Sequence, residues 1–256
     1  MTMASNVTGK INEKYSKINL FFDAKKNVDS LLVRNAELLN QQTPNLAIID
    51  TSVHEVADYI VLDTLGNTKK IVQYIYRPAT VIYNNTTNDD LKNYMLLNRG
   101  TANGIAKDMA VLGAESNAVI GKIIYADAQY AVVMTLLHTQ SILSAKLKNT
   151  GENGSITWDG GNSRTVILKK IPSSVALKVG DSIVTNNGTD IYPENLLIGT
   201  IASFKDDKAN GNYIIKVKTK ANFNQINYVQ IIENIKQKET RTALENAKKV
   251  VNNTLK

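Results

Sequence analysis

Hydrophobic residues recur at intervals of three and four positions in the first part of the chain, and polar residues fill the positions between them. This seven-residue periodicity predicts a helix that pairs with another helix along an apolar seam. The register breaks once, between Phe22 and Val28, and Pro44 ends the segment. We therefore predict a dimerising coiled-coil helix over residues 8–43, with a single helix packed on its own body as the alternative. The expected dimer interface consists of Ile11, Tyr15, Ile18, Phe22, Val28, Leu31 and Leu38.

From about residue 55 the pattern changes to short runs of β-branched and aromatic residues, separated by glycine-containing turns. Many short strands without helical interludes predict an all-β sandwich or barrel. The strands are too numerous for one small barrel, so we expect two. The predicted strands are Val56–Asp63, Lys70–Tyr76, Thr80–Tyr83, Tyr94–Leu97, Ala110–Leu112, Val119–Tyr125, Tyr130–Leu136, Ile142–Lys148, Ser155–Trp158, Thr165–Lys170, Ser182–Thr185, Leu196–Phe204, Tyr213–Thr219 and Val229–Ile232.

Composition narrows the class of protein. Apolar residues make up 43% of the 256 residues and aromatic residues 6%, which is typical of a soluble globular protein. The chain has no cysteine, so thiolate catalysis and thiolate metal ligation are excluded. No run of about 18 uncharged apolar residues occurs, so the sequence predicts no transmembrane helix.

Positive charge is concentrated at the two ends of the chain. The formal net charge is +7, and residues 236–256 alone contain six basic and two acidic side chains. A nucleic-acid-binding protein usually carries its basic charge on the folded surface, so we do not expect a nucleic-acid partner. We expect residues 236–256 to form a basic tail, either disordered or a frayed helix near the capping-box pair Thr242 and Glu245. Residues 1–7 are expected to be a disordered, vector-derived start, with a native cytosolic start as the alternative.

Several glycine-containing motifs follow one another in a specific order: Asn98-Arg99-Gly100, Asn103-Gly104-Ile105, Asp108-Met109-Ala110-Val111, Ala118-Val119-Ile120-Gly121-Lys122-Ile123, Gly180-Asp181-Ser182-Ile183-Val184-Thr185 and Gly188-Thr189-Asp190-Ile191-Tyr192-Pro193. Leu197-Ile198-Gly199-Thr200-Ile201 ends the series. This ordered set resembles the rod-shape-determining protein MreC family, and the resemblance extends from residue 8 to about residue 233. Asn186-Asn187 and Glu194-Asn195 depart from the family pattern, which puts the local turn geometry in doubt but not the fold.

The resemblance implies a mainly β fold, in which the N-terminal coiled-coil helix is followed by two small six-stranded β-barrels. The strand order fits a nested arrangement. Residues 46–125 and 204–235 would form the first barrel, and residues 126–203 would form a second, inserted barrel. A sequential split into two barrels remains the alternative.

The motif residues have structural explanations. We expect Gly100, Gly104 and Gly188 to supply turns with positive φ. Gly121 and Gly199 lie inside predicted strands, where glycine indicates a bulge or a tight barrel bend. The remaining turn positions are Gly180, Asp181 and Pro193. These features build barrels, so we predict no catalytic, cofactor-binding or metal-binding residues.

Three alternative interpretations have weaker support in the sequence. A two-barrel serine-protease-like hydrolase would place His54, an aspartate and Ser182 in one site, but the residues after Ser182 read as a plain strand and lack an oxyanion-hole glycine. A metal site could use His54, Glu55 and Asp58, but His138 is distant in sequence. A β-barrel that binds glycans or nucleic acids would need several aromatic residues on one face, whereas the tyrosines here are scattered.

The resemblance implies a non-enzymatic, dimeric scaffold of the bacterial cell-elongation machinery, which builds the peptidoglycan wall. It implies a single N-terminal membrane anchor that precedes this sequence, and a body on the periplasmic face of the inner membrane. The implied partners are a transpeptidase of the penicillin-binding protein 2 type, the membrane proteins MreD and RodZ and, indirectly, MreB. Self-association into filaments is also implied. No cofactor and no small-molecule substrate are expected.

Overall fold

The computed structural model describes residues 28, 30–38, 74–86, 91–188 and 190–254. Residues 30–38 are helical. The elements that follow are β1 (Tyr74–Asn84), β2 (Tyr94–Leu97), η1 (Thr101–Asn103), β3 (Ala110–Gly113), β4 (Val119–Ala126), β5 (Ala131–Thr135), β6 (Leu143–Leu147), β7 (Asn153–Thr157), β8 (Thr165–Pro172), β9 (Ser182–Thr185), β10 (Leu197–Asp207), β11 (Asn212–Thr219), η2 (Phe223–Gln225), β12 (Tyr228–Asn234) and α2 (Gln237–Thr254).

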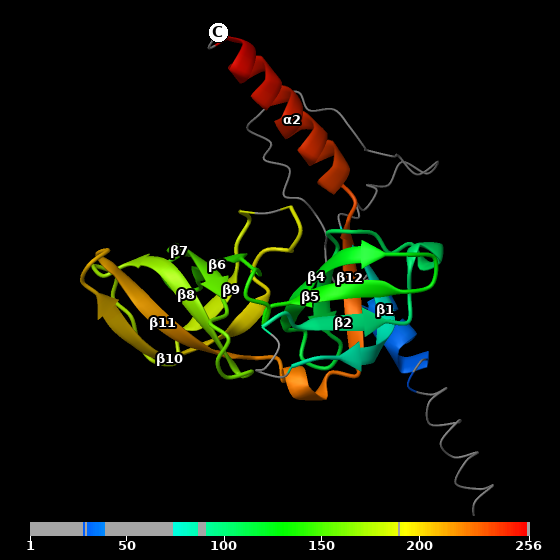
Figure 1. Cartoon of the computed structure of the whole chain (residues 1–256), viewed down its shortest axis with the longest axis horizontal. Coiled ribbons are helices and arrows are strands. Elements are labelled where there is room, and N and C mark those ends of the chain that lie inside the picture. The colour runs from blue at the N-terminus through cyan, green and yellow to red at the C-terminus, as the bar shows by residue number, and fades with distance from the viewer. Residues whose placement is uncertain (1–27, 29, 39–73, 87–90, 189, 255–256) are drawn as a thin grey trace, which may run out of the picture.

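The strands form two closed barrels that lie side by side (Figure 1). The first barrel has the strand order β1-β12-β3-β4-β5-β2, and the second has the order β10-β11-β8-β7-β6-β9. The second barrel is therefore inserted between β5 and β12 of the first. The strand pairs are antiparallel, and closure leaves neither barrel with an unpaired edge.

The barrel boundaries differ from those expected. β5 pairs with both β2 and β4, so it belongs to the first barrel and not to the insert. β10 and β11 pair with β9 and β8, so they belong to the second barrel. Hydrophobic alternation identifies a strand but not its neighbour, which is why the expected limits at residues 125/126 and 203/204 are wrong. The expected part of the first barrel at residues 46–73 lies outside the described residues.

Alternation of side chains between the two faces of each strand produces the barrel cores. In β6, for example, Leu143, Ala145 and Leu147 are buried, whereas Ser144 and Lys146 are half-buried on the other face. The buried residues of both barrels form one continuous cluster. Each fully buried large aliphatic side chain contributes roughly 1.5–3 kcal/mol before conformational entropy is subtracted.

Two of the three turn glycines do not have the expected conformation. Gly104 has a φ of +75°, as expected. Gly100 has a φ of −136°, and Gly188 is not among the residues with positive φ. At Gly100 the requirement is space, because a Cβ atom would overlap the carbonyl oxygen of Asp127. At Gly188 a Cβ atom would lie 2.9 Å from Ser144 Oγ, so close packing explains this glycine as well.

The strand glycines allow neighbouring backbones to approach closely. A Cβ atom on Gly121 would overlap the carbonyl oxygen of Met134 in β5, and one on Gly199 would overlap that of Lys218 in β11. The ladder register shifts beside both glycines. Gly180 has a φ of +95°, and Asp181 Oδ2 accepts a hydrogen bond from the Lys178 amide at 2.9 Å. The Pro193 carbonyl accepts one from Thr185 Oγ1 at 2.6 Å.

The helical parts of the structure lie outside the barrels. Of the predicted stalk over residues 8–43, residues 30–38 are helical, whereas Ile11, Tyr15, Ile18 and Phe22 lie outside the described residues. The basic tail, whose order the sequence left open, forms α2, which projects from the first barrel (Figure 1). No helix within the described residues is long and apolar enough to cross a membrane.

Candidate functional site

The helix of residues 30–38 packs against the outside of the first barrel. Ala36 faces the barrel and is only 4% exposed. The buried side chain of Gln230, in β12, donates a hydrogen bond from Nε2 to the Leu32 carbonyl at 3.4 Å. One face of this helix is therefore occupied by its own barrel, as the single-helix alternative requires for this stretch.

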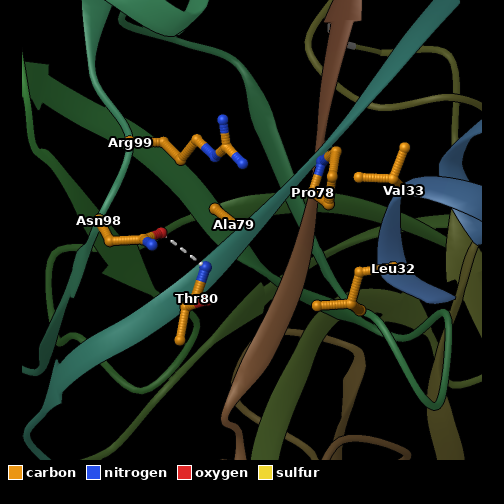
Figure 2. Close-up of a pocket in the computed structure, with 7 residues that line it drawn as sticks. All are labelled: Leu32, Val33, Pro78, Ala79, Thr80, Asn98 and Arg99. Atoms are coloured by element: carbon orange, nitrogen blue, oxygen red, sulfur yellow. Dashed lines mark hydrogen bonds between the residues drawn. The ribbon is translucent and has the colours of Figure 1, made fainter. Parts of the chain in front are cut away.

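A shallow pocket of about 110 Å³ lies between this helix and the barrel (Figure 2). Asn98 lines it and accepts a hydrogen bond from the Thr80 amide at 2.8 Å, and the neighbouring Arg99 also lines it. Small-molecule sites usually enclose roughly 300–1,000 Å³, so this pocket is a gap in helix packing and not a substrate site. Its lining residues are Leu32, Val33, Pro78, Ala79, Thr80, Asn98 and Arg99.

The opposite face of the same helix carries exposed apolar side chains. Leu31 is 67% exposed and Leu38 is 39% exposed, and the two residues are seven positions apart. Two helical turns separate them, so they lie on one side of the helix. An ion pair between Arg34 and Glu37, with 3.0 Å between Nη1 and Oε2, flanks them. This outward seam is the part of the expected dimer interface that the structure describes, together with Val28, which is half-buried.

A row of apolar side chains crosses four adjacent strands on the outer face of the first barrel. Register places Tyr83 of β1 beside Leu96 of β2, Leu96 beside Val132 of β5, and Val132 beside Tyr125 of β4. Leu96 points outward because its neighbours Met95 and Leu97 are fully buried. The two tyrosines at the ends of the row are each 58% exposed. We call Tyr83, Leu96, Val132 and Tyr125 the tyrosine row.

Charged side chains from three parts of the chain meet at the junction between the barrels. Arg241 of α2 contacts Asp190 of the β9–β10 loop, with 2.7 Å between Nε and Oδ2 and 3.4 Å between Nη2 and Oδ1. Its Nη1 atom also lies 3.0 Å from Oδ2 of Asp108, in the loop before β3. Lys122 Nζ is 3.4 Å from Oδ1 of Asp108. We call Asp108, Lys122, Asp190 and Arg241 the junction cluster.

The junction cluster perturbs the acid–base properties of its members. Burial alone would raise the pKa of Asp108, but hydrogen bonds and charge from Arg241 and Lys122 outweigh it, so the pKa lies below its usual value. Hydrogen bonding to Asp190 raises the pKa of Arg241, and Asp108 adds to this effect. Burial, with the nearby charge of Asp108, raises the pKa of Tyr192. The Asp108 carboxylate therefore stays ionised at neutral pH.

The residues of the hydrolase and metal alternatives do not converge within the described part of the chain. Ser182 lies in β9, opposite Thr200 of β10. His138 is buried in the segment between β5 and β6, where its Nε2 atom is 2.9 Å from the Tyr94 hydroxyl and its Nδ1 atom accepts the Gln140 amide at 3.0 Å. The described residues contain no group of three or more His, Cys, Asp or Glu side chains placed to hold a metal ion. His54, Glu55 and Asp58 lie outside the described residues.

Sequence reasoning missed both the tyrosine row and the junction cluster. The row is created by pairing across four strands, and its members are far apart in the sequence. The cluster joins positions 108, 190 and 241, whose spacing carries no periodic signal. The one available hint was that Asp108 and Asp190 both stand inside the ordered glycine motifs.

Comparison with known proteins identifies the family. The model of the family "Rod shape-determining protein MreC, barrel core" matches residues 81–233. The cell shape-determining protein MreC of Listeria monocytogenes is 26% identical over 201 residues, which cover 76% of this chain and 66% of that protein. The chain thus spans about two thirds of that relative's length.

Solved structures of MreC proteins share the fold. The Listeria monocytogenes MreC structure superimposes with a TM-score of 0.57 at 23% identity, covering 91% of this chain and 96% of that one. MreC in a complex with a penicillin-binding protein (PBP2) from Helicobacter pylori gives a TM-score of 0.50 at 13% identity, covering 63% of this chain and 99% of that one. With the family model matched over most of both barrels, the chain belongs to the rod shape-determining protein MreC family.

Proposed function

We propose that this chain is a non-enzymatic, dimeric scaffold of the bacterial cell-elongation machinery. The observation that carries the proposal is the division of the helix of residues 30–38 into two faces. Ala36 is buried against the first barrel, whereas Leu31 and Leu38 are exposed on the other side. A helix held in place by its own barrel, with an apolar seam turned outward, is suited to pair with a second copy.

Energetics favour burial of this seam. An exposed leucine is common on protein surfaces, but these two have the seven-residue spacing of the apolar repeat that precedes the break between Phe22 and Val28. Full burial of one leucine side chain is worth roughly 1.5–3 kcal/mol before the entropy cost of association. Because the barrel has already fixed the backbone of residues 30–38, pairing costs less entropy than it would for an isolated helix.

The partner that we propose for the barrels is a transpeptidase of the penicillin-binding protein 2 type. A Helicobacter pylori MreC that shares this fold is found in a complex with a penicillin-binding protein (PBP2). The tyrosine row is the proposed contact surface on this chain. Tyrosine is enriched in protein interfaces because it combines a large apolar ring with a polar hydroxyl, and the row contains no charged residue that binding would desolvate.

Family membership supports a proposal for the location and the membrane partners of this chain. We propose that the chain acts on the periplasmic face of the inner membrane, with MreD and RodZ as membrane partners and an indirect connection to MreB. Self-association of barrels into filaments is part of the same proposal. No observation on the described residues favours the hydrolase, glycan-binding or nucleic-acid-binding alternative.

The mass of the protein in solution tests the dimer. Sedimentation equilibrium is expected to give a dimer for the wild type and a monomer for Leu31→Asp/Leu38→Asp. The control is Ser30→Asp, which adds one negative charge at an exposed neighbouring position outside the seam, and it should remain dimeric. A wild-type monomer at micromolar concentration, or a double variant that is still dimeric, would contradict pairing through this seam.

A further inference from the structure

The two barrels are parts of one continuous chain. The chain crosses between them twice, between β5 and β6 and again between β11 and β12. The second crossing contains η2, whose Phe223 side chain is fully buried. In Figure 1, η2 lies at the lower edge of the junction, whereas α2 rises from the upper edge.

The upper edge is closed by contacts that involve the start of α2. Arg241 reaches Asp108 of the first barrel and Asp190 of the second at 3.0 Å and 2.7 Å. Gln237 Nε2 donates to the Asp108 carbonyl at 3.3 Å. Asn234, at the end of β12, donates from Nδ2 to the Asp190 carbonyl at 2.8 Å. One short stretch of chain therefore holds a loop of each barrel.

We propose that the start of α2 is a clasp that holds the two barrels at one angle, with Arg241 as the cation that both barrels share. The inference concerns the geometry between the barrels and does not depend on the dimer or on the transpeptidase. It gives the segment after the barrels a positioning role: this segment sets the direction in which the second barrel is presented.

The chemistry of arginine fits this role. Its planar guanidinium offers five N–H donors in a fixed fork, so one side chain can serve two carboxylates from different directions, which the point charge of a lysine does poorly. The side chains of Asp108 and Asp190 are only 19% and 22% exposed, so water screens their mutual repulsion poorly once the guanidinium is removed. Arg241 itself is 41% exposed. The contact is therefore accessible to solvent and can be released without unfolding either barrel.

The backbone of Asp108 supports the same conclusion. Its φ of +67° lies in the left-handed region, which is uncommon for non-glycine residues but is tolerated better by aspartate than by most. Here the side chain is fixed by Arg241 and Lys122, and the carbonyl by Gln237. The loop before β3 is thus shaped to present a carboxylate to α2.

The test is a distance measurement between the barrels by pulsed electron paramagnetic resonance. The chain has no native cysteine, so Glu115→Cys in the first barrel and Lys208→Cys in the second can carry nitroxide labels at exposed turns. Labelled protein is mixed with excess unlabelled protein, so that only distances within one chain are recorded. The wild type is expected to give a single narrow distance.

Arg241→Ala is expected to broaden or split that distance, and so is a chain that ends at Lys236. Asp190→Asn tests the same contact from the second barrel with minimal change in volume. Lys248→Ala, an exposed position further along α2, is the control that should leave the peak unchanged. Circular dichroism and thermal melting verify that the barrels of each variant are folded.

Two results would overturn the clasp. The first is an unchanged narrow distance in folded Arg241→Ala and Asp190→Asn. The second is equal broadening in Lys248→Ala, which would show that any perturbation of α2 has the same effect. Neither result bears on the dimer, because sedimentation and the distance within one chain are independent readouts.

Discussion

The two helices are attached to the barrels by different forces. The helix of residues 30–38 is held by apolar packing at Ala36 and by a hydrogen bond from the Gln230 side chain to the Leu32 carbonyl, whereas α2 is held mainly by charged and polar groups around Arg241. Apolar contacts are insensitive to salt, and partly exposed ion pairs are screened by it. The first attachment is therefore suited to a permanent interface and the second to an adjustable one.

The largest free-energy change is expected when the apolar packing between the helix of residues 30–38 and the first barrel is disrupted. Ala36→Asp places a carboxylate at a 4% exposed position without a cationic partner. An uncompensated buried charge costs about 3 kcal/mol or more, so the helix of residues 30–38 should leave the barrel. Hydrogen exchange of its amides would then become fast. Glu37→Gln changes an exposed side chain one position later and should leave the exchange of these amides slow. If both variants lost protection from exchange equally, packing at Ala36 would not be what holds the helix.

The tyrosine row should behave as the second apolar surface. Tyr83→Ser/Tyr125→Ser is expected to weaken binding of a penicillin-binding protein 2-type transpeptidase from the same organism by about tenfold or more, since interface tyrosines often contribute over 1 kcal/mol each. The free energy of unfolding should change little because both side chains are 58% exposed. Titration calorimetry measures the affinity. Unchanged affinity would mean that the transpeptidase does not bind at the tyrosine row.

A smaller loss of stability is expected when the charged contacts of α2 are removed. Arg241→Ala should lower the free energy of unfolding by about 1 kcal/mol at low ionic strength, a value reduced for solvent screening because Arg241 is 41% exposed. In 1 M salt, where the Debye length is about 3 Å, wild type and variant should converge. Urea unfolding at two salt concentrations checks this. A difference that persists in high salt would indicate that packing, and not charge, holds α2.

The smallest expected effect is a decrease in the stability of the folded protein at acidic pH. The pKa of Asp108 is lower in the folded protein than its ordinary value, because Arg241 and Lys122 outweigh burial. Its contribution to stability is therefore fully present above the unfolded pKa of about 3.9 and is lost as the pH falls through the lower folded pKa. Urea midpoints of the wild type should decline below about pH 4 more steeply than those of Asp108→Asn. If the urea midpoints of the two proteins fell in parallel with pH, Asp108 would not contribute to the pH dependence of stability.

Local structure was predictable from the sequence where short runs of β-forming residues are bounded by turn residues. The predicted strands Tyr94–Leu97 and Ser182–Thr185 coincide with β2 and β9, because each run contains aromatic, aliphatic or β-branched residues and no helix-period repeat. The assignment of β5, β10 and β11 to barrels was not predictable, since it depends on pairing between distant segments. The number of predicted strands already indicated two barrels, and the family resemblance implied the same architecture.

The functional surfaces were predictable only in part. The seam positions Leu31 and Leu38 follow from helical periodicity, and the structure leaves both exposed. The burial of Ala36 was not expected, because a small residue beside a seam gives no sign that a barrel will cover it. Arg241 and its two carboxylates were missed for the same physical reason: tertiary proximity of single charges leaves no trace in spacing or composition.

The central claim, that two copies pair through the outward seam of residues 30–38, is tested most directly by disulfide formation between chains. The sequence has no cysteine, so Leu31→Cys and Leu38→Cys each introduce a single thiol, and Ser30→Cys places one at an exposed position outside the seam. Under mild oxidation, Leu31→Cys and Leu38→Cys should form covalent dimers rapidly, and Ser30→Cys should not. Equal rates of disulfide formation in all three variants, or a covalent dimer only from Ser30→Cys, would contradict pairing through the outward seam.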